Sequence, residues 1–224
     1  MPTAAHRAFK NGLYGQYARI GKALASPHRL EVLELLAQGE RTVESLSTEL
    51  TLSTANTSQH LQALRRAGLV ETRRQGLFVH YRLADPAVCD LCRAVRTVAE
   101  RRLADLDRLV REEFGDRAAN APVSMKQLLA RSRTGDVMIL DTRPASEYLA
   151  GHIAGALSVP VDELHQRLRG LPKSKEYVAY CRGPYCVYAD RAVELLRRSG
   201  RRAHRLIEGF PEWKADGLPI QIGA

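Results

Sequence analysis

The chain has 224 residues, of which 45% are hydrophobic and 26% charged, so it is long enough for two domains and apolar enough for packed cores. This composition excludes a disordered or collagen-like chain. The formal net charge of +9 favours a polyanionic partner, and no apolar run approaches the about 18 residues that a membrane span needs, so we expect no membrane association.

Apolar residues recur at helical spacing through the first third of the chain. Ser26 before Pro27 predicts the start of a helix over residues 28–37. The same spacing predicts helices over residues 43–50 and 54–67, joined by a tight connection. Two short helices of which the second is polar are typical of a helix-turn-helix. Residues 69–74 and 77–83 then flank Gln75-Gly76, which predicts a β-hairpin wing.

The predicted second helix and the wing carry side chains suited to double-stranded DNA. We expect six polar side chains to lie on the exposed side of the helix and reach base edges in the major groove: Thr54, Asn56, Thr57, Ser58, Gln59 and His60. Arg73 and Arg74 near the wing tip, with Arg82, suit phosphate contacts. For any one of these residues the alternative is a solvated helix face, but the whole constellation favours operator DNA as the partner.

This half of the chain resembles the ArsR/SmtB family of bacterial repressors over about residues 10–112. The resemblance rests on four segments: Ser26-Pro27-His28-Arg29-Leu30, Ser58-Gln59-His60-Leu61, Leu64-Arg65-Arg66-Ala67-Gly68-Leu69-Val70 and Tyr81-Arg82-Leu83. It implies a homodimer, built through the first and last helices of the domain, that leaves its operator when an inducer binds.

Residues 86–113 are predicted to form a helix with an apolar stripe along one side. A helix of this length with such a stripe needs a partner, which is consistent with a dimer interface. The stripe consists of Val88, Cys92, Val95, Ala99, Leu103, Leu106 and Leu109. Cys89 and Cys92 lie three residues apart on this helix, so they are candidate sensor thiols, or Cys92 is simply a small apolar residue in the seam. The Cys-x-Cys group of the family's metal sensors is absent at residues 52–55, so we assign no metal site and expect no cofactor.

A turn-rich stretch at residues 116–122 predicts a linker between a DNA-binding and dimerisation domain over residues 1–115 and a second domain over residues 123–224. After it, β-type runs at 137–140 and 177–180 alternate with helical stretches, which predicts a parallel sheet with crossover helices. The predicted fold class is therefore α+β: a winged helix-turn-helix followed by an α/β domain. With no export signal, we expect a cytoplasmic protein whose cysteines serve chemistry rather than structural disulfides.

The second half closely resembles the rhodanese family over about residues 123–220. The resemblance rests on Asp141-Thr142-Arg143, on residues 147–156 with their Gly151-His152-Ile153, on a strand that ends at Cys181, and on residues 206–213. It implies a sulfurtransferase. Asp141 and Arg143 match the family's Asp-x-Arg, and we assign them, with His152, to support of the loop and fold.

Cys181 is the candidate nucleophile. It ends a predicted strand and precedes a predicted helix over residues 187–199, whose N-terminal N–H groups stabilise a thiolate. Such a thiolate attacks a sulfane donor, such as thiosulfate or polysulfide, and becomes a persulfide. Gly183, Pro184, Tyr185 and Val187 complete the active-site segment. The loop itself has the six residues 181–186, and Val187 starts the helix. Six is the loop length of sulfur-transferring rhodaneses, whereas the related phosphatases and arsenate reductases use a loop one residue longer, so the resemblance implies sulfur transfer.

Neighbours of Cys181 carry further expectations. Arg182 is placed to attract an anionic donor. Cys186 is placed to accept the persulfide sulfur, to close a disulfide or polysulfide with Cys181, or to pack under the loop. Tyr185 and Trp213 are pocket walls or core aromatics.

The function predicted from the sequence is a DNA-binding transcriptional regulator that responds to reactive sulfur. Three arrangements stay open. The rhodanese domain makes or removes a signal that Cys89 and Cys92 read; the rhodanese domain is itself the sensor; or the protein is an arsenite-type, metalloid-responsive repressor with an accessory rhodanese module.

Overall fold

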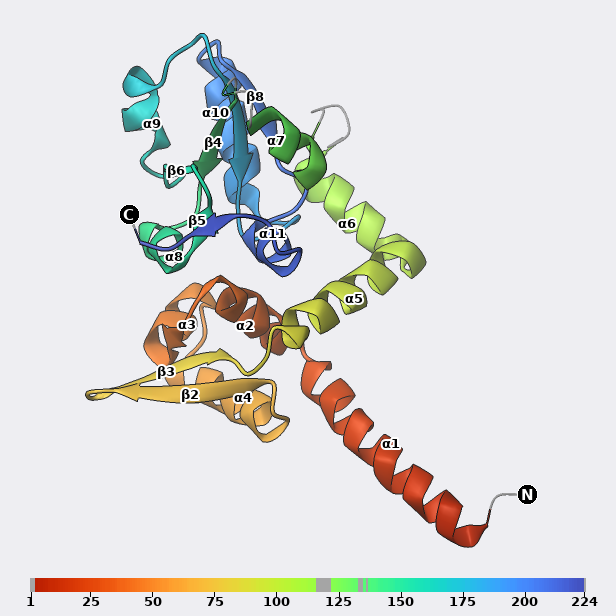
Figure 1. The fold of residues 1–224 in the computed structure, drawn as a ribbon. Coiled ribbons are helices and arrows are strands. Elements are labelled where there is room, and N and C mark those ends of the chain that lie inside the picture. Colours follow the sequence, from red (N-terminus) through yellow and green to blue (C-terminus); the bar gives the residue numbers. More distant parts are fainter. Residues whose placement is uncertain (1–2, 116–121, 133–134, 136, 224) are drawn as a thin grey trace. The chain divides into compact units, whose positions relative to one another are not determined.

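The computed structural model describes residues 3–115, 122–132, 135 and 137–223, and the chain divides into two compact units, Met1–Arg93 and Ala94–Ala224 (Figure 1). The predicted linker at residues 116–122 lies outside the described residues apart from Pro122. The predicted winged helix-turn-helix and α/β folds are both confirmed, and each unit builds its own core.

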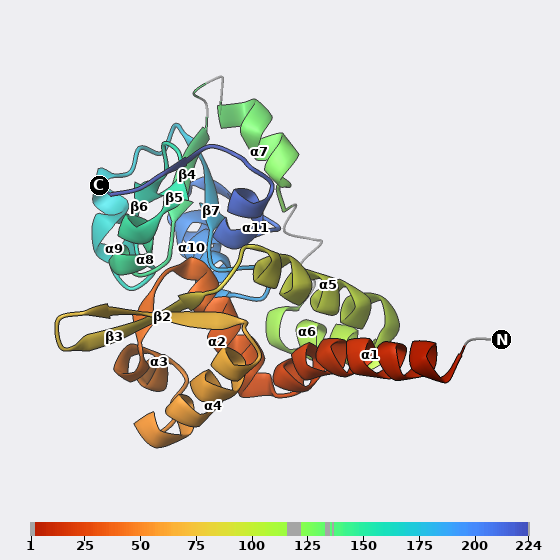
Figure 2. The same cartoon turned by 60° about the horizontal axis from the view of Figure 1, so that its bottom comes forward.

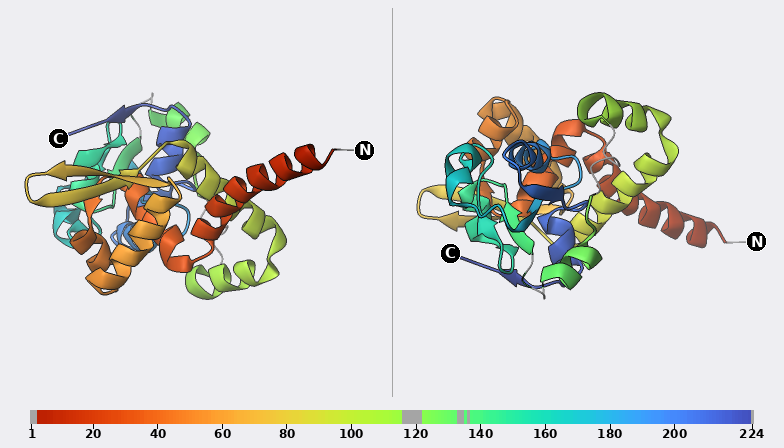
Figure 3. Two further views of the ribbon diagram at one scale, coloured as in Figure 1. Left: turned by 90° about the horizontal axis from the view of Figure 1, so that it is seen from below. Right: turned by 90° about the horizontal axis from the view of Figure 1, so that it is seen from above.

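The first unit begins with a series of helices, several of which start at a capping side chain. It contains α1 (Ala4–Leu24), α2 (Pro27–Gln38), α3 (Val43–Glu49) and α4 (Thr54–Arg66). The side chains of Thr42 and Ser53 cap α3 and α4 by accepting hydrogen bonds from backbone N–H groups. The predicted helices at 28–37, 43–50 and 54–67 are confirmed to within a residue. In Figure 3 α1 extends beyond the other helices of its unit.

One core joins α2, α3 and α4 because each presents an apolar stripe to the others. Val32, Leu46, Leu61 and Leu64 are fully buried there. The predicted wing is confirmed as β2 (Val70–Gln75) and β3 (Phe78–Leu83), and β1 (Arg41–Thr42) adds to the outer side of β3 in an antiparallel sheet of order β1-β3-β2. Figure 2 shows the hairpin projecting beside α3 and α4.

The helix predicted over residues 86–113 is interrupted. The structure has α5 (Ala87–Arg102) and α6 (Ala104–Phe114), separated by Leu103, whose φ of −109° and ψ of 101° are extended. The charges explain a break here: α5 ends on Arg101 and Arg102, and α6 begins with Asp105 and Asp107 in its first turn. Cations suit a helix C-terminus and anions a helix N-terminus, so this sequence favours two helices over one.

A parallel sheet organises the second unit. Its strands β4 (Val137–Asp141), β6 (Leu157–Ser158), β7 (Glu176–Tyr180) and β8 (Arg202–Arg205) lie in the order β6-β4-β7-β8. Side chains of β7 alternate between two cores: Tyr177 and Ala179 point to one face, and Val178 and Tyr180 to the other. Both faces are thus buried, as a parallel sheet requires.

Helices cover both faces of this sheet (Figure 1). One face is covered by α9 (Leu164–Arg167), the 3-10 turn η2 (Leu168–Gly170) and α10 (Val187–Arg198), and the other by α7 (Met125–Ser132) and α11 (Phe210–Ala215). A short helix α8 (Ala145–Ala150) leads into β5 (His152–Ile153), which pairs antiparallel with β9 (Ile220–Gln221).

Thr57 of α4 corrects one expectation from the sequence. It was expected on the exposed side of the helix, but it is fully buried. Thr57, Leu61 and Leu64 are spaced four and three residues apart, so they share the core-facing side of α4. Its Oγ1 atom has no hydrogen-bond partner within the part of the chain that the structure describes.

We therefore expect Thr57→Val to stabilise the first unit by about 1 kcal/mol, because a buried hydroxyl without a partner costs about 1 to 3 kcal/mol. Both residues are β-branched, so helix propensity changes little. Hydrogen exchange of the α4 amides measures the change. Thr54→Val, on the exposed first turn, is the matched control and should give no gain. A loss of protection in Thr57→Val would show that the hydroxyl is satisfied.

Candidate functional site

The Cys181 loop joins the end of a strand to the start of a helix. Cys181 follows β7 directly, and Cys186 is the N-cap residue of α10. The neighbouring parallel strand β4 ends at Asp141, level with Tyr180 in the sheet register. The loop therefore lies at the carboxyl edge of the central strands and at a helix N-terminus, where open α/β sheets bind ligands and where negative charge is stabilised.

A disulfide joins Cys181 to Cys186, with their Cα atoms 6.2 Å apart. The sequence left several roles open for Cys186, and the one seen in the structure is a disulfide with Cys181. Cys181 is 1% exposed, whereas Cys186 is only half-buried. The expected Cys181 thiolate is not present in this state, so the structure describes the oxidised form of the loop.

Hydrogen bonds from two other elements hold the loop's carbonyl groups. The backbone N–H of Phe210, at the start of α11, donates to the Cys181 carbonyl oxygen at 3.1 Å. The Nη2 atom of Arg205, at the end of β8, donates to the carbonyl oxygens of Pro184 and Gly183 at 2.9 and 3.4 Å. Arg205 is itself buried and lies 3.5 Å from the Asp190 carboxylate on α10. These contacts fix the path of the loop between β7 and α10.

Arg182 is bound by a carboxylate of α8. Its Nη2 and Nε atoms donate to Glu147 Oε1 at 2.6 and 2.9 Å, and the side chains are only 11% and 3% exposed. The sequence predicted that Arg182 attracts an anionic donor, but much of its charge is neutralised by this pair. A buried ion pair of this kind is costly to break, because the remaining partner is left as an uncompensated charge. Arg182 thus ties the loop to α8.

Gly209 lies against the back of the loop. A Cβ atom on Gly209 would come within 2.4 Å of the Gly183 nitrogen and 2.6 Å of the Arg182 carbonyl oxygen. No side chain fits at that distance from a backbone, so glycine is required. Sequence reasoning did not identify Glu147, Arg205 or Gly209 as site residues, because each lies 19 or more residues along the chain from the loop and only the fold brings them to it.

Asp141 and Arg143 form a fully buried cluster with Tyr180. Arg143 donates to both Asp141 oxygens and to the Gly151 carbonyl oxygen, and the Tyr180 hydroxyl donates to Asp141 Oδ2 at 2.5 Å. Burial and the charge of Asp141 raise the pKa of Tyr180 well above its usual value, so its hydroxyl stays a donor. Burial lowers the pKa of Arg143, but the bond to Asp141 outweighs it and the pKa is raised. The cluster holds the end of β7, the strand that Cys181 follows directly.

His152 and Trp213 belong to the framework rather than to the loop. His152 is buried, donates from Nδ1 to the Tyr148 carbonyl oxygen at 2.9 Å, and stacks on the Tyr148 ring. Trp213 is 2% exposed and donates from Nε1 to the Pro219 carbonyl oxygen, which makes it a core aromatic. Tyr185 of the loop is half-buried.

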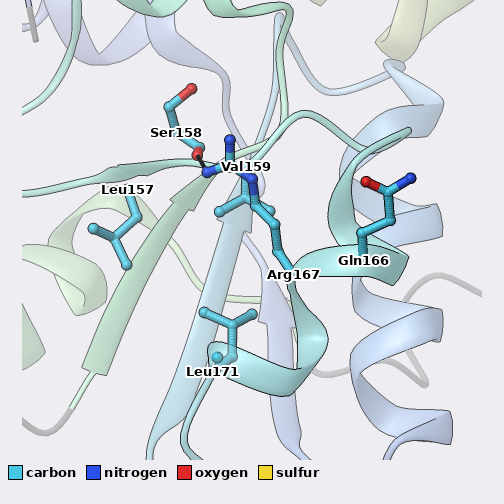
Figure 4. Close-up of a pocket in the computed structure, with 7 residues that line it drawn as sticks. Leu157, Ser158, Val159, Gln166, Arg167 and Leu171 are labelled. Carbon is cyan, nitrogen blue, oxygen red and sulfur yellow. Dashed lines mark hydrogen bonds between the residues drawn. The ribbon is translucent and has the colours of Figure 1, made fainter.

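A surface pocket of this unit lies beside β6, α9 and η2 (Figure 4). Its lining includes Leu157, Val159 and Leu171, and Arg167 donates across it to the Ser158 carbonyl oxygen at 3.1 Å. Arg167 is also paired with Glu163. None of its lining residues belongs to the Cys181–Cys186 loop, so it is no part of the thiol site.

The structure sorts the predicted DNA-contacting side chains of α4 by exposure. Thr54 and Gln59 are exposed, and Asn56 and Ser58 are half-buried. His60 is half-buried against His28, with 5.4 Å between ring centroids, and burial and then the neighbouring His28 charge lower its pKa. Together with the buried Thr57, His60 is therefore turned toward its own unit.

Two of the three wing arginines are held by carboxylates. Arg73 pairs with Glu40 at 2.6 Å, and this bond lowers the pKa of Glu40. Arg82 pairs with Glu71 and Glu40. Arg74 is exposed, and among the described residues no ion pair binds it. Arg74 is thus the wing cation best placed for a phosphate.

Cys89 and Cys92 lie in the first turns of α5, and both are half-buried. Cys92 packs against the core of the first unit, next to Leu91 and Val88. Within residues 3–115, 122–132, 135 and 137–223 there is no group of three or more His, Cys, Asp or Glu residues that could hold a metal ion. No helix in the same ranges is both long and apolar enough to cross a membrane.

Comparisons with known proteins match both units. The family model for the bacterial regulatory protein, arsR family, matches residues 26–72, and that for a rhodanese-like domain matches residues 124–216. The HTH-type transcriptional regulator Rv0324 of Mycobacterium tuberculosis is 44% identical over 215 residues, which cover 96% of this chain and 94% of that protein. This chain is an ArsR-family transcriptional regulator. It carries a rhodanese-like domain after its winged helix-turn-helix.

Other relatives match single units of this ArsR-family regulator. A sulfurtransferase of Allochromatium vinosum is 34% identical over 97 residues, 43% of this chain and 88% of that protein. The homodimeric winged helix-turn-helix domain of Mb0332 from Mycobacterium bovis, solved by NMR, is 44% identical and has a TM-score of 0.42, covering 47% of this chain and 95% of that one.

The close approach of Gly209 to the loop predicts that Gly209→Ala destabilises the rhodanese-like domain by about 1 to 3 kcal/mol, the usual cost of overpacking. Thermal unfolding of the full-length ArsR-family regulator measures the effect. Gly170→Ala is the matched control, since a Cβ atom there meets nothing within 4 Å, and it should leave the transition unchanged. Equal melting temperatures of the two variants would mean that the loop adapts to the methyl group added at residue 209.

Proposed function

We propose that this ArsR-family regulator is a homodimer that binds operator DNA and responds to reactive sulfur, and that its rhodanese-like domain transfers sulfane sulfur through a persulfide on Cys181. One observation carries the proposal: a six-residue loop with a cysteine at each end closes the path from the central strand β7 to the N-terminus of α10. The likeness to a sulfurtransferase over 97 residues supports the same chemistry.

Sulfur transfer starts from the reduced loop. The Cys181 thiolate attacks the outer sulfur of a sulfane donor; with thiosulfate, the sulfur–sulfur bond of the donor breaks and sulfite leaves with the electron pair. The N-terminus of α10 stabilises the thiolate before the attack and the anionic persulfide after it. Because Arg182 is paired with Glu147, we assign it to positioning of the loop rather than to capture of the donor. Asp141 and Arg143 support the strand ends.

Operator binding is assigned to α4 and the wing. Thr54 and Gln59 are exposed, and Ser58 and Asn56 are partly so, which leaves four polar side chains to reach base edges. Arg74 is available for a phosphate. Operator DNA lies in the cytoplasm of a bacterium, which is where we place the regulator.

The dimer is proposed from apolar side chains that the single chain leaves exposed. Phe9, Tyr14 and Tyr17 on α1 are 58–64% exposed. On α5 and α6 the exposed apolar residues are Val95, Val98 and Leu109, with Leu103 between the helices. Such residues on long helices are typical of surfaces that another chain covers.

Cys89 and Cys92 are proposed as the thiols that read the sulfur signal. Cys92 lies at the seam between α5 and the core that carries α4, so an added sulfur atom there changes how α5 packs on that core. Release of DNA then needs a change of only about 1 to 3 kcal/mol in the free-energy difference between two dimer states.

For DNA binding we predict that Ser58→Ala with Gln59→Ala lowers specific affinity by about 1 to 3 kcal/mol per lost base contact while non-specific affinity stays nearly constant. Arg74→Ala should weaken all sequences alike and reduce the salt slope by about one. Arg73→Ala is the matched control: its guanidinium is held by Glu40, so its effect should be smaller. Gel-shift titrations with genomic fragments at several salt concentrations test this. Unchanged binding in all variants would refute the assigned interface.

For the sulfur response we predict that thiosulfate or polysulfide releases the reduced wild-type regulator from operator DNA in a fluorescence anisotropy titration. Cys181→Ser should stay bound if the rhodanese-like domain produces the signal or is itself the sensor. The Cys89→Ser and Cys92→Ser variants should stay bound if these two thiols read the signal. Arsenite in place of the sulfur donor is the comparison arm. Release by arsenite alone, with no effect of sulfur donors, would establish the metalloid response instead.

A further inference from the structure

We propose that the loop of the rhodanese-like domain reduces sulfane sulfur to hydrosulfide, with Cys186 as the resolving thiol and a dithiol as the reductant. The inference rests on the proposed Cys181 persulfide and goes beyond it, because it names the fate of the sulfur and the second substrate. The observation behind it is the Cys181–Cys186 disulfide within the six-residue loop.

The resolving step is an attack inside one loop. The Cys186 thiolate attacks the Cys181 Sγ atom of the persulfide, and a new bond forms between the two cysteine sulfurs. The bond from Cys181 Sγ to the outer sulfur breaks, and that sulfur leaves with the electron pair and takes up one proton from water, so that it is released as hydrosulfide. The two thiols are oxidised by two electrons to the disulfide, and the sulfane sulfur is reduced by the same two electrons.

Two sulfur atoms of the persulfide are open to Cys186, and the structure favours the inner one. Attack on the outer sulfur would move the persulfide to Cys186 and leave Cys181 as a thiolate. Attack on the inner sulfur yields the disulfide that the structure contains. The cysteines are five residues apart in a loop held by Arg205, Phe210 and Glu147, so the attacking thiol is already close to its target.

Exposure decides where the reductant reacts. Cys181 is 1% exposed and Cys186 half-buried, so an incoming thiolate reaches the Cys186 sulfur. Cys181 is then the leaving group, and the N-terminus of α10 stabilises it as a thiolate. A dithiol reductant completes the exchange with its second thiol, which releases Cys186 from the mixed disulfide. The product is the reduced loop, ready for the next donor.

The same disulfide controls entry to the cycle. A cysteine in a disulfide has no thiolate for a sulfane donor, so the oxidised loop accepts no sulfur. The rate of sulfide production therefore depends on the supply of dithiol as well as of sulfane sulfur. The concentration of sulfane sulfur to which the regulator responds would then depend on how much dithiol is available to reduce it.

The test uses the full-length chain, reduced and then freed of reductant, with thiosulfate as the probe. Wild type should release about one equivalent of hydrosulfide per chain in a single burst and then stop, with the loop peptide about 2 Da lighter than its reduced form. Cys186→Ser and, as a second variant, Cys186→Ala should release less than about a tenth as much and should carry an added mass of about 32 Da on Cys181, one sulfur atom. Cyanide added to these variants should give thiocyanate.

The outcomes separate this inference from the function on which it rests. If wild type keeps the added sulfur on Cys181 or Cys186, releases no hydrosulfide and yields thiocyanate with cyanide, the resolving role is overturned and sulfur transfer stands. If neither wild type nor variants gain sulfur or form thiocyanate, sulfur transfer at Cys181 fails and the inference fails with it. A burst of hydrosulfide that is equal in wild type and in both Cys186 variants also overturns it.

Discussion

The Cys181 loop depends on contacts that its own six residues do not make. A segment this short, between a buried strand and a helix, has few internal hydrogen bonds, and the bonds from Phe210, Arg205 and Glu147 hold it from three separate elements. Gly209 lets one of those elements approach to backbone contact. The reactivity proposed for Cys181 is therefore a property of the packed domain, since without these contacts the two loop cysteines would not be held together at the start of α10.

Two buried ion pairs also hold the rhodanese-like domain in place around the loop. Arg143 and Asp141 are fully buried as a hydrogen-bonded pair, and Arg182 and Glu147 nearly so. Each pair links residues that the chain must hold at the carboxyl edge of the sheet. Such pairs add little net stability compared with apolar packing, but they strongly disfavour any arrangement that separates the partners. In this domain they specify one position for the loop and for the end of β4.

The first unit combines a core of ordinary apolar helices with a surface suited to reading DNA. The number of arginines in the wing overstates the positive charge that is free to bind a ligand. Arg73 and Arg82 are paired with carboxylates, whereas no described ion pair binds Arg74. Cys92 packs against this core, so a change in the size of its side chain would alter the packing of the core to which α4 contributes.

The sequence by itself determined the order of the elements, the two fold types, the family resemblances and the identity of Cys181 as the candidate nucleophile. Local signals suffice for these, since capping residues, helical spacing, the turn at Gln75-Gly76 and strand-like runs act over a few residues. The break at Leu103 was missed because no proline or glycine marks it. Only the tertiary structure decided that Thr57 is buried, that Arg182 is held by Glu147, that Arg205 and Gly209 support the loop, and that Cys186 is bonded to Cys181. The reason is physical: exposure, ion pairing and close backbone approach depend on segments distant in the chain, and no local pattern records which of them meet.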